Sequence, residues 1–152
     1  MRSLNPKDLQ YRIRYEIKRL GMWSLAAEYL LLGTAAQESH CGRWLEQMDN
    51  GPAIGIFQME PKTYFDVLQN VVPAFTKKTG FKKSDFPENP EFLKYDINLA
   101  IQLARFYYAR FSEPLPFPKV TALGRYWKKY WNTSKGKGTV EEYVKNFPII
   151  IV

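Results

Sequence analysis

Ser24-Leu-Ala-Ala-Glu-Tyr-Leu-Leu-Leu-Gly-Thr-Ala-Ala-Gln-Glu-Ser39 is the stretch of sequence that decides the fold. Ser24 is one of the residue types that favour a helix N-cap, and the positions after it are apolar almost without interruption. Because a helix that is apolar on nearly all sides is normally buried, we expect this segment to be the central helix of the protein. Glu38 lies at the far end of that helix.

Helical patterns also precede and follow this segment. Asn5-Pro6 has the form of a helix start, and the apolar spacing after it predicts an N-terminal helix within residues 1–20. Further helices are expected at residues 61–71, 91–111 and 120–131, with a short last helix starting from a capping box at 139–142. The turn residues in 40–53 and 76–90 predict surface loops. The apolar residues 147–152 predict a tail that packs on the domain or docks on a partner.

Composition agrees with one folded domain. The chain has 152 residues, of which 45% are hydrophobic and 16% aromatic, so it can bury a substantial core. No internal repeat or long linker divides it. We therefore expect a mainly α fold, with a single compact helical domain over residues 1–152.

The charge balance favours an anionic partner. There are 22 Lys and Arg residues against 15 Asp and Glu, a net charge of +7, which suits a cell-wall polymer, a nucleic acid or a membrane surface. The lysines are dispersed through loops without a recognised nucleic-acid-binding pattern, so we expect no specific nucleic acid. We also expect no transmembrane segment and no signal peptide, since no apolar run approaches the roughly 18 residues of a membrane span.

The sequence offers no metal site and no cofactor motif. Cys41 is the only cysteine and His40 the only histidine, so the three or four ligands of a structural zinc ion are missing. We expect Cys41 to be a small buried apolar residue and His40 to lie outside the chemistry. The expected cofactor and metal content is therefore none.

A turn-rich segment follows Glu38 in the chain. It reads Gly51-Pro-Ala-Ile-Gly-Ile-Phe-Gln-Met-Glu-Pro61 and combines turn residues with one glutamine. A glutamate at a helix end, facing such a turn, can hold one acid over a polysaccharide. Burial among apolar side chains would raise the pKa of Glu38 toward neutral pH, as proton donation to a glycosidic oxygen requires.

Taken together, the motifs resemble the lytic transglycosylase side of the lysozyme superfamily, the soluble-lytic-transglycosylase-like domain related to goose-type lysozyme. Glu38-Ser39 matches the helix-terminal Glu-Ser of that family, and Gly55-Ile-Phe-Gln-Met-Glu-Pro61 is similar to its Gly-Leu-Met-Gln-Ile-x-Pro turn. Asn98 occupies the place of an asparagine on the family's central helix. Tyr130-Trp-Asn132 is a looser match to its Ala-Tyr-Asn segment. The resemblance covers about residues 24–146 and implies a lysozyme-like helical domain.

The resemblance also implies an activity and a site. Members of the family cleave the β-1,4 bond between N-acetylmuramic acid and N-acetylglucosamine in peptidoglycan strands, with one glutamate acting as acid and then as base. Glu38 would be that catalytic residue. The residues implied to bind the substrate or to order the glutamate are Ser39, Gly55, Ile56, Phe57, Gln58, Met59, Tyr130, Trp131 and Asn132.

Other interpretations stay open at this point. A lysozyme-type hydrolase would need a second carboxylate, for which Asp49 and Glu46 are candidates. Gln58 could simply tie the turn together, and the aromatic residues around Trp131 could simply fill the core. The altered third motif and the apolar tail also fit a catalytically weak or inactive virion component.

The expected setting is a bacteriophage protein. The proline-rich residues 113–118 and the glycine- and lysine-rich residues 135–139 are similar to segments of small phage-encoded versions of the domain. We expect a protein of the virion or the host cytoplasm that is delivered to the cell wall or periplasm for penetration or lysis. Peptidoglycan and other virion proteins are the expected partners.

Overall fold

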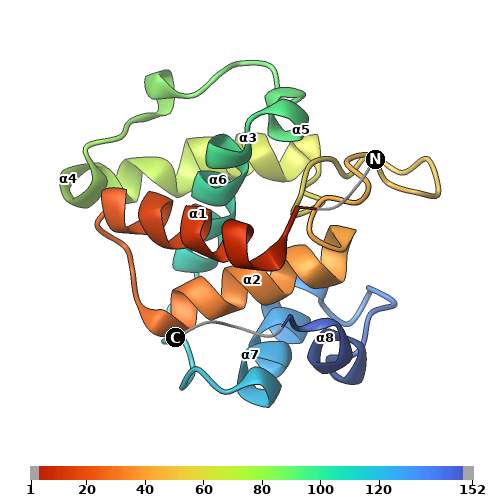
Figure 1. The fold of residues 1–152 in the computed structure, drawn as a ribbon. Helices are drawn as coiled ribbons and strands as arrows, with labels where there is room; N and C mark the ends of the chain where they lie inside the picture. The colour runs from red at the N-terminus through yellow and green to blue at the C-terminus, as the bar shows by residue number, and fades with distance from the viewer. Residues whose placement is uncertain (1–3, 149–152) are drawn as a thin grey trace.

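Helix α2 (Leu25–Ser39) runs through the centre of the molecule, between α1 and α6 on one side and α7 and α8 on the other (Figure 1). The Ser24 hydroxyl accepts the Ala27 N–H at 3.0 Å and so caps its first turn. Every residue from Ala26 to Ala36 is buried. The predicted central helix is therefore confirmed.

The computed structural model describes residues 4–148, and this part of the chain is mainly α-helical. Within it there is no β-strand, only isolated bridges that pair Ile54 with Glu46 and with Met59. No helix among the described residues is long and apolar enough to cross a membrane. The remaining α-helices are α1 (Pro6–Arg19), α3 (Pro61–Asn70), α4 (Thr76–Thr79), α5 (Phe92–Tyr95), α6 (Ile97–Ala109), α7 (Val120–Trp127) and α8 (Val140–Asn146).

Local capping sets several of these boundaries as predicted. The Asn5 side chain accepts the Lys7 N–H at 2.9 Å at the start of α1. Thr139 and Glu142 form the expected reciprocal capping box at the start of α8, with each side chain accepting the other residue's backbone N–H at 3.1 Å. Helix α3 begins at Pro61, whose missing N–H costs nothing in the first turn.

The single long helix predicted for residues 91–111 is wrong. The chain forms α5 and α6 instead, separated by Asp96, whose backbone is extended with φ −109° and ψ 101°. The Asp96 carboxylate accepts the Leu99 N–H at 3.1 Å and starts α6 as an N-cap. Aspartate favours caps because its short side chain competes with the backbone for hydrogen bonds, and here that local preference interrupts a continuous apolar period.

Tyr143 of α8 fixes the position of α2 against α7. A Cβ atom on Gly33 would lie 2.1 Å from the Tyr143 hydroxyl oxygen, so the ring occupies space that only a glycine leaves free. A Cβ on Gly124 of α7 would lie 3.1 Å from the same ring. The hydroxyl donates to the Leu30 carbonyl at 3.3 Å. This close approach holds the end of α7 beside the last turns of α2.

Two buried carboxylates tie α1 to its neighbours. Glu28 of α2 accepts hydrogen bonds from Arg14 and Gln10 of α1 and from Trp23. Burial alone would raise the pKa of Glu28, but these three donors together lower it. Glu16 of α1 accepts from Gln102 of α6 at 2.6 Å.

The loop and tail predictions have mixed outcomes. Residues 76–90 lie largely at the surface as expected, although they contain α4 and a short helical turn at Lys83–Asp85. Phe147 is half-buried and packs edge-on against Tyr29, which agrees with a packed start to the tail. Residues 149–152 of the predicted tail lie outside the described residues.

Candidate active site

The Glu38 carboxyl group lies half-buried in the last turn of α2. Its Oε2 atom accepts the indole N–H of Trp127, the last residue of α7, at 3.0 Å. Burial raises the pKa of Glu38 to about 7, although the indole donor pulls it in the other direction. At neutral pH this carboxyl can therefore both give and accept a proton.

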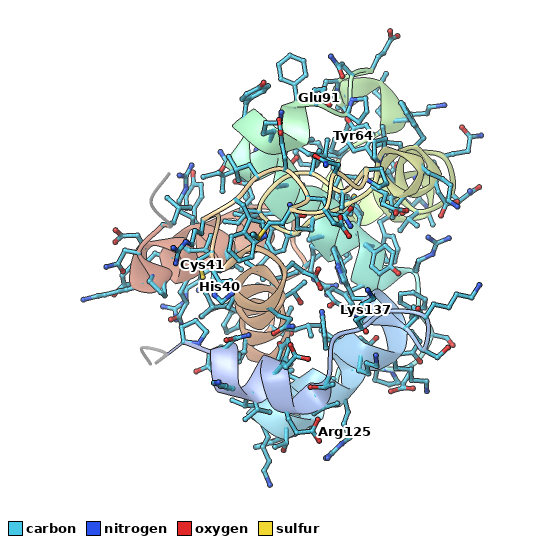
Figure 2. All side chains as sticks on the ribbon, turned by 90° about the vertical axis from the view of Figure 1, so that its right-hand side faces the viewer. His40, Cys41, Tyr64, Glu91, Arg125 and Lys137 are labelled. Atoms are coloured by element: carbon cyan, nitrogen blue, oxygen red, sulfur yellow. The ribbon has the colours of Figure 1, made fainter. Side chains whose placement is uncertain are left out.

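Helix α2 ends immediately after Glu38. His40 adopts a left-handed conformation with φ 49°, is exposed, and packs edge-on against Trp44 with 4.8 Å between the ring centroids. Cys41 is buried, and burial raises the pKa of its thiol to about 11, so it is an inert apolar residue as predicted. Figure 2 looks onto the end of α2, with His40 and Cys41 on one side of the helix and Lys137 on the other.

The Gly55–Met59 segment forms a tight turn beside this helix end. The backbones of Ile54 and Met59 exchange two hydrogen bonds of 3.0 Å, which close the turn. Gly55 has φ +83°, and a Cβ on it would lie 2.6 Å from the Leu93 carbonyl oxygen. Gln58 also has a positive φ, of 52°, and its side-chain amide donates to the Gly55 carbonyl at 2.9 Å. Gln58 therefore stabilises the turn through a side-chain hydrogen bond, which is one of the two roles expected for it. The residue also lines the cleft described below.

Ser39 is buried at the end of α2 and links this helix to the turn through hydrogen bonds of its side chain. Its hydroxyl donates to the Ile56 carbonyl at 2.6 Å and accepts the Gly42 N–H at 2.8 Å. Ser39, Ile56 and Phe57 are all at most 2% exposed. The structure therefore places these three predicted substrate-binding residues in the interior, where they order the helix end and the turn instead of facing a ligand.

A polar cleft of about 500 Å³ opens beside Glu38. A second, shallower hollow of about 340 Å³ shares Glu38, Gln47, Ala53 and Gln58 with it, so the acid lies where the two meet. An extended ligand could pass Glu38 on both sides. The larger cleft is lined by Glu38, Gln47, Ala53, Gln58, Met59, Glu60, Thr63, Tyr107, Trp131, Asn132, Thr133, Lys135 and Gly136.

The third predicted motif contributes two of its three residues to the cleft. Trp131 and Asn132 line it, in a π-helical turn (Lys128–Asn132) that continues α7. The Trp131 ring packs edge-on against Tyr107 with 4.7 Å between centroids. Tyr130 is not among the lining residues, and its hydroxyl bonds Glu113 at 2.7 Å. Its side chain belongs to an aromatic cluster with Phe111 and Tyr126.

Sequence reasoning missed most of the cleft wall. Trp127 contacts Glu38 directly. In the sequence it is one of several aromatic residues at helical spacing, and nothing distinguishes it from the others as a site residue. Lys128 donates to Asn132 Oδ1 at 2.6 Å, a contact that its sequence context does not indicate. Lining residues such as Gln47 and Glu60 carry no sequence signal, because only the fold brings them to the cleft.

The other carboxylates near Glu38 divide into two groups. Asp49 lines the shallower hollow and Glu60 the larger cleft, so both share a concave surface with Glu38. Glu46 lines neither hollow and pairs with Lys94 instead. Asn98 is exposed on α6 and faces a separate shallow pocket with Tyr11 and Arg12, away from the cleft.

No set of three or more His, Cys, Asp or Glu residues in positions 4–148 is arranged to hold a metal ion. The site contains one carboxyl group poised for proton transfer, an indole donor that orients it, and a polar groove on either side.

No family model matches the chain, and neither curated proteins nor solved structures show a significant similarity to it. The assignment of chemistry therefore rests on the geometry of the site itself.

Proposed function

We propose that the protein is a peptidoglycan-degrading lytic transglycosylase that cleaves the β-1,4 bond between N-acetylmuramic acid and N-acetylglucosamine. One observation carries this proposal. Glu38 has a pKa of about 7, is held by Trp127 and opens onto a polar cleft that extends on both sides. A carboxyl group in that state is suited to general acid catalysis on a chain-like substrate.

The mechanism needs only this one carboxyl group. Protonated Glu38 gives its proton to the glycosidic oxygen as the bond from that oxygen to the anomeric carbon breaks, which releases N-acetylglucosamine as the leaving sugar. The Glu38 carboxylate then accepts the proton of the muramic acid 6-hydroxyl while that oxygen bonds to the anomeric carbon. The product is a 1,6-anhydro sugar, no water is consumed, and Glu38 ends the cycle protonated. An oriented internal hydroxyl replaces an enzymic nucleophile at high effective concentration.

The lining of the cleft supports a sugar substrate. Its amide side chains, Gln47, Gln58 and Asn132, can exchange hydrogen bonds with hydroxyl and acetamido groups. The Trp131 ring offers an apolar face against which a sugar ring can pack. The net charge of +7 favours approach to an anionic cell wall.

The biological setting belongs to the same proposal. We place the protein in a bacteriophage, carried in the virion or made in the host cytoplasm, and delivered to the wall for entry or release. The support for this is the resemblance of its loop segments to phage-encoded domains together with the cell-wall chemistry above.

The test is the release of soluble fragments from purified peptidoglycan by the wild-type chain, by Glu38→Gln and by Glu141→Gln. Glu141 is an exposed residue of α8 and serves as a matched control for the loss of one carboxylate. We expect release by the wild type and the control, and a loss of about 10²–10⁴-fold with Glu38→Gln. Equal release by a folded Glu38→Gln variant would contradict the proposal, and no release by any of the three would favour a structural virion component.

A second candidate function is hydrolysis by a lysozyme-type mechanism. The observation in its favour is that Asp49 and Glu60 line the hollows on either side of Glu38. A second carboxylate could activate water. Reducing-end products that disappear in Asp49→Asn or Glu60→Gln would establish this mechanism in place of the transglycosylase one.

A further inference from the structure

Lys128 directly follows Trp127, the residue that contacts Glu38, and its side chain makes three hydrogen bonds. Its ammonium group donates to Asn132 Oδ1 at 2.6 Å, to the Gly138 carbonyl at 2.7 Å and to the Gly136 carbonyl at 3.1 Å. An ammonium group has three N–H donors, so these acceptors use all of them. Bonds from a charged donor are roughly twice as strong as neutral ones.

The loop that Lys128 holds lies directly on the site. A Cβ on Gly138 would lie 2.6 Å from the Cη2 atom of Trp127, so the Gly138 backbone packs on the indole ring. A Cβ on Gly136 would lie 2.4 Å from the Asn132 side-chain nitrogen, so the same loop covers a residue of the cleft wall. Gly136 itself lines the cleft.

Backbone hydrogen bonds hold the start of the loop: the Thr133 N–H donates to the Lys128 carbonyl at 2.8 Å, and the Gly136 N–H donates to the Thr133 carbonyl at 3.2 Å. Residues 133–138 read Thr-Ser-Lys-Gly-Lys-Gly, have no regular secondary structure and include two glycines. Ordering such residues costs backbone conformational entropy. Its side chains Lys135 and Lys137 are exposed, so they add little packing. The Lys128 ammonium thus anchors the far end of the loop, at Gly136 and Gly138, to the turn that continues α7.

We propose that Lys128 is a positioning residue of the site: it holds the Gly136 and Gly138 carbonyls so that the loop stays on Trp127 and keeps the indole N–H on Glu38. The chain of contacts runs from Lys128 through Gly138 and Trp127 to the acid. Through Asn132 the same ammonium also fixes one wall of the cleft. The effect on turnover rests on the proposed function of Glu38, whereas the effect on the indole does not.

The test compares Lys128→Met with Lys129→Met. Lys129 is the next residue in the same π-helical turn, is 62% exposed and pairs with Glu113 at the surface, so it controls for the loss of a lysine there. The readout is the indole N–H resonance of Trp127 in a proton–nitrogen NMR spectrum. The chain has four tryptophans, and the Trp127→Phe variant identifies the resonance by its disappearance.

In Lys128→Met we expect the Trp127 indole hydrogen to exchange with solvent at least about tenfold faster, because the contact that shields it is released. We also expect its resonance to follow the protonation of Glu38 more weakly than in the wild type. Backbone amides inside α2 should keep their exchange rates, which separates local loosening from global destabilisation. If Lys128→Met does not fold, Lys128→Gln keeps a hydrogen-bond donor on a shorter chain and gives the same comparison.

An indole resonance with unchanged exchange and unchanged pH response in folded Lys128→Met would overturn this proposal. Where the wild type releases wall fragments, we also expect kcat to fall about tenfold or more in Lys128→Met and to hold in Lys129→Met. A wild type with no turnover but with the predicted indole changes would contradict the proposed function alone and leave the positioning role of Lys128 standing.

Discussion

Trp127 donates its indole N–H to the Glu38 carboxylate at 3.0 Å, although 89 positions separate the two residues in sequence. The donor ends α7 and the acceptor lies in the last turn of α2, so the contact depends on how these two helices pack. Tyr143, between Gly33 and Gly124, sets that packing. The orientation of the acid therefore depends on the packing of α2 against α7, in addition to the loop that packs on the indole ring.

Replacing Trp127 with Phe should shift the pH dependence of activity upward. The indole hydrogen bond lowers the pKa of Glu38 against the effect of burial, so its removal raises that pKa further. The descending limb of kcat/KM, which reports protonated Glu38, then moves to higher pH. Because Trp127 is fully buried, we also expect a loss of about 1–3 kcal/mol in the free energy of unfolding. An unshifted limb would mean that the indole does not control the acid.

The wild-type protein should lose activity as pH rises above about 7. In the proposed mechanism Glu38 acts first as an acid, so only its protonated form starts the reaction, and kcat/KM should fall about tenfold for each pH unit above the pKa. Initial rates of fragment release across neutral pH would measure this limb. A rate that stays constant well above pH 7 would indicate that a group other than the Glu38 carboxyl supplies the proton.

Glu38→Gln should stabilise the protein at alkaline pH. The folded-state pKa of Glu38 is about 7, above its ordinary value of 4.5, so the folded state binds the proton more tightly than the unfolded state does. The contribution of Glu38 protonation to folding stability is fully present below the unfolded-state pKa, and it is lost as the pH rises through the folded-state pKa. We expect the free energy of unfolding of Glu38→Gln to exceed that of the wild type by about 3 kcal/mol at pH 8 and by less than about 1 kcal/mol at pH 5.

Thermal or urea unfolding at the two pH values measures this difference. The Glu141→Gln control, at an exposed position, should show no such dependence on pH. A Glu38→Gln variant that is no more stable than the wild type at pH 8 would indicate that the carboxyl group is better solvated than its burial implies.

Gly55→Ala should destabilise the protein more than Gly80→Ala. Both glycines have a positive φ, of 83° and 78°, which disfavours alanine at either position. Only at Gly55 would the new methyl group meet backbone, at 2.6 Å from the Leu93 carbonyl oxygen, whereas Gly80 has open space around it. We expect a cost of about 1 kcal/mol at Gly80 and about 2–4 kcal/mol at Gly55. Equal losses in urea unfolding would contradict the close approach of the turn to Leu93.

Features set by local sequence were predicted well. The apolar run after Ser24 identified the central helix, because a helix that is buried on every side has apolar residues at nearly all positions and not on one face alone. Capping residues such as Asn5 and Thr139 located helix starts within a residue. The prediction of one helix over residues 91–111 failed at Asp96. The apolar period continues through this residue and hides its local tendency to cap a new helix.

Features that depend on long-range packing were only partly predicted. Glu38, Gln58 and Asn132 come together at one cleft, but the burial of Ser39 and the turning away of Tyr130 follow from contacts with Ile56 and Glu113. No short pattern encodes such contacts. A motif therefore identified which segments meet at the site, and the fold decided which of their side chains face the cleft.

Mass spectrometry of the muropeptides released from purified peptidoglycan tests the proposed function most directly. We predict that the wild-type chain releases fragments that end in 1,6-anhydromuramic acid and that the folded Glu38→Gln variant, compared with Glu141→Gln, does not. Fragments with free reducing ends would contradict the transglycosylase mechanism and favour hydrolysis through Asp49 or Glu60. The same anhydro products from Glu38→Gln, or no fragments from the folded wild type, would contradict the role of Glu38 itself.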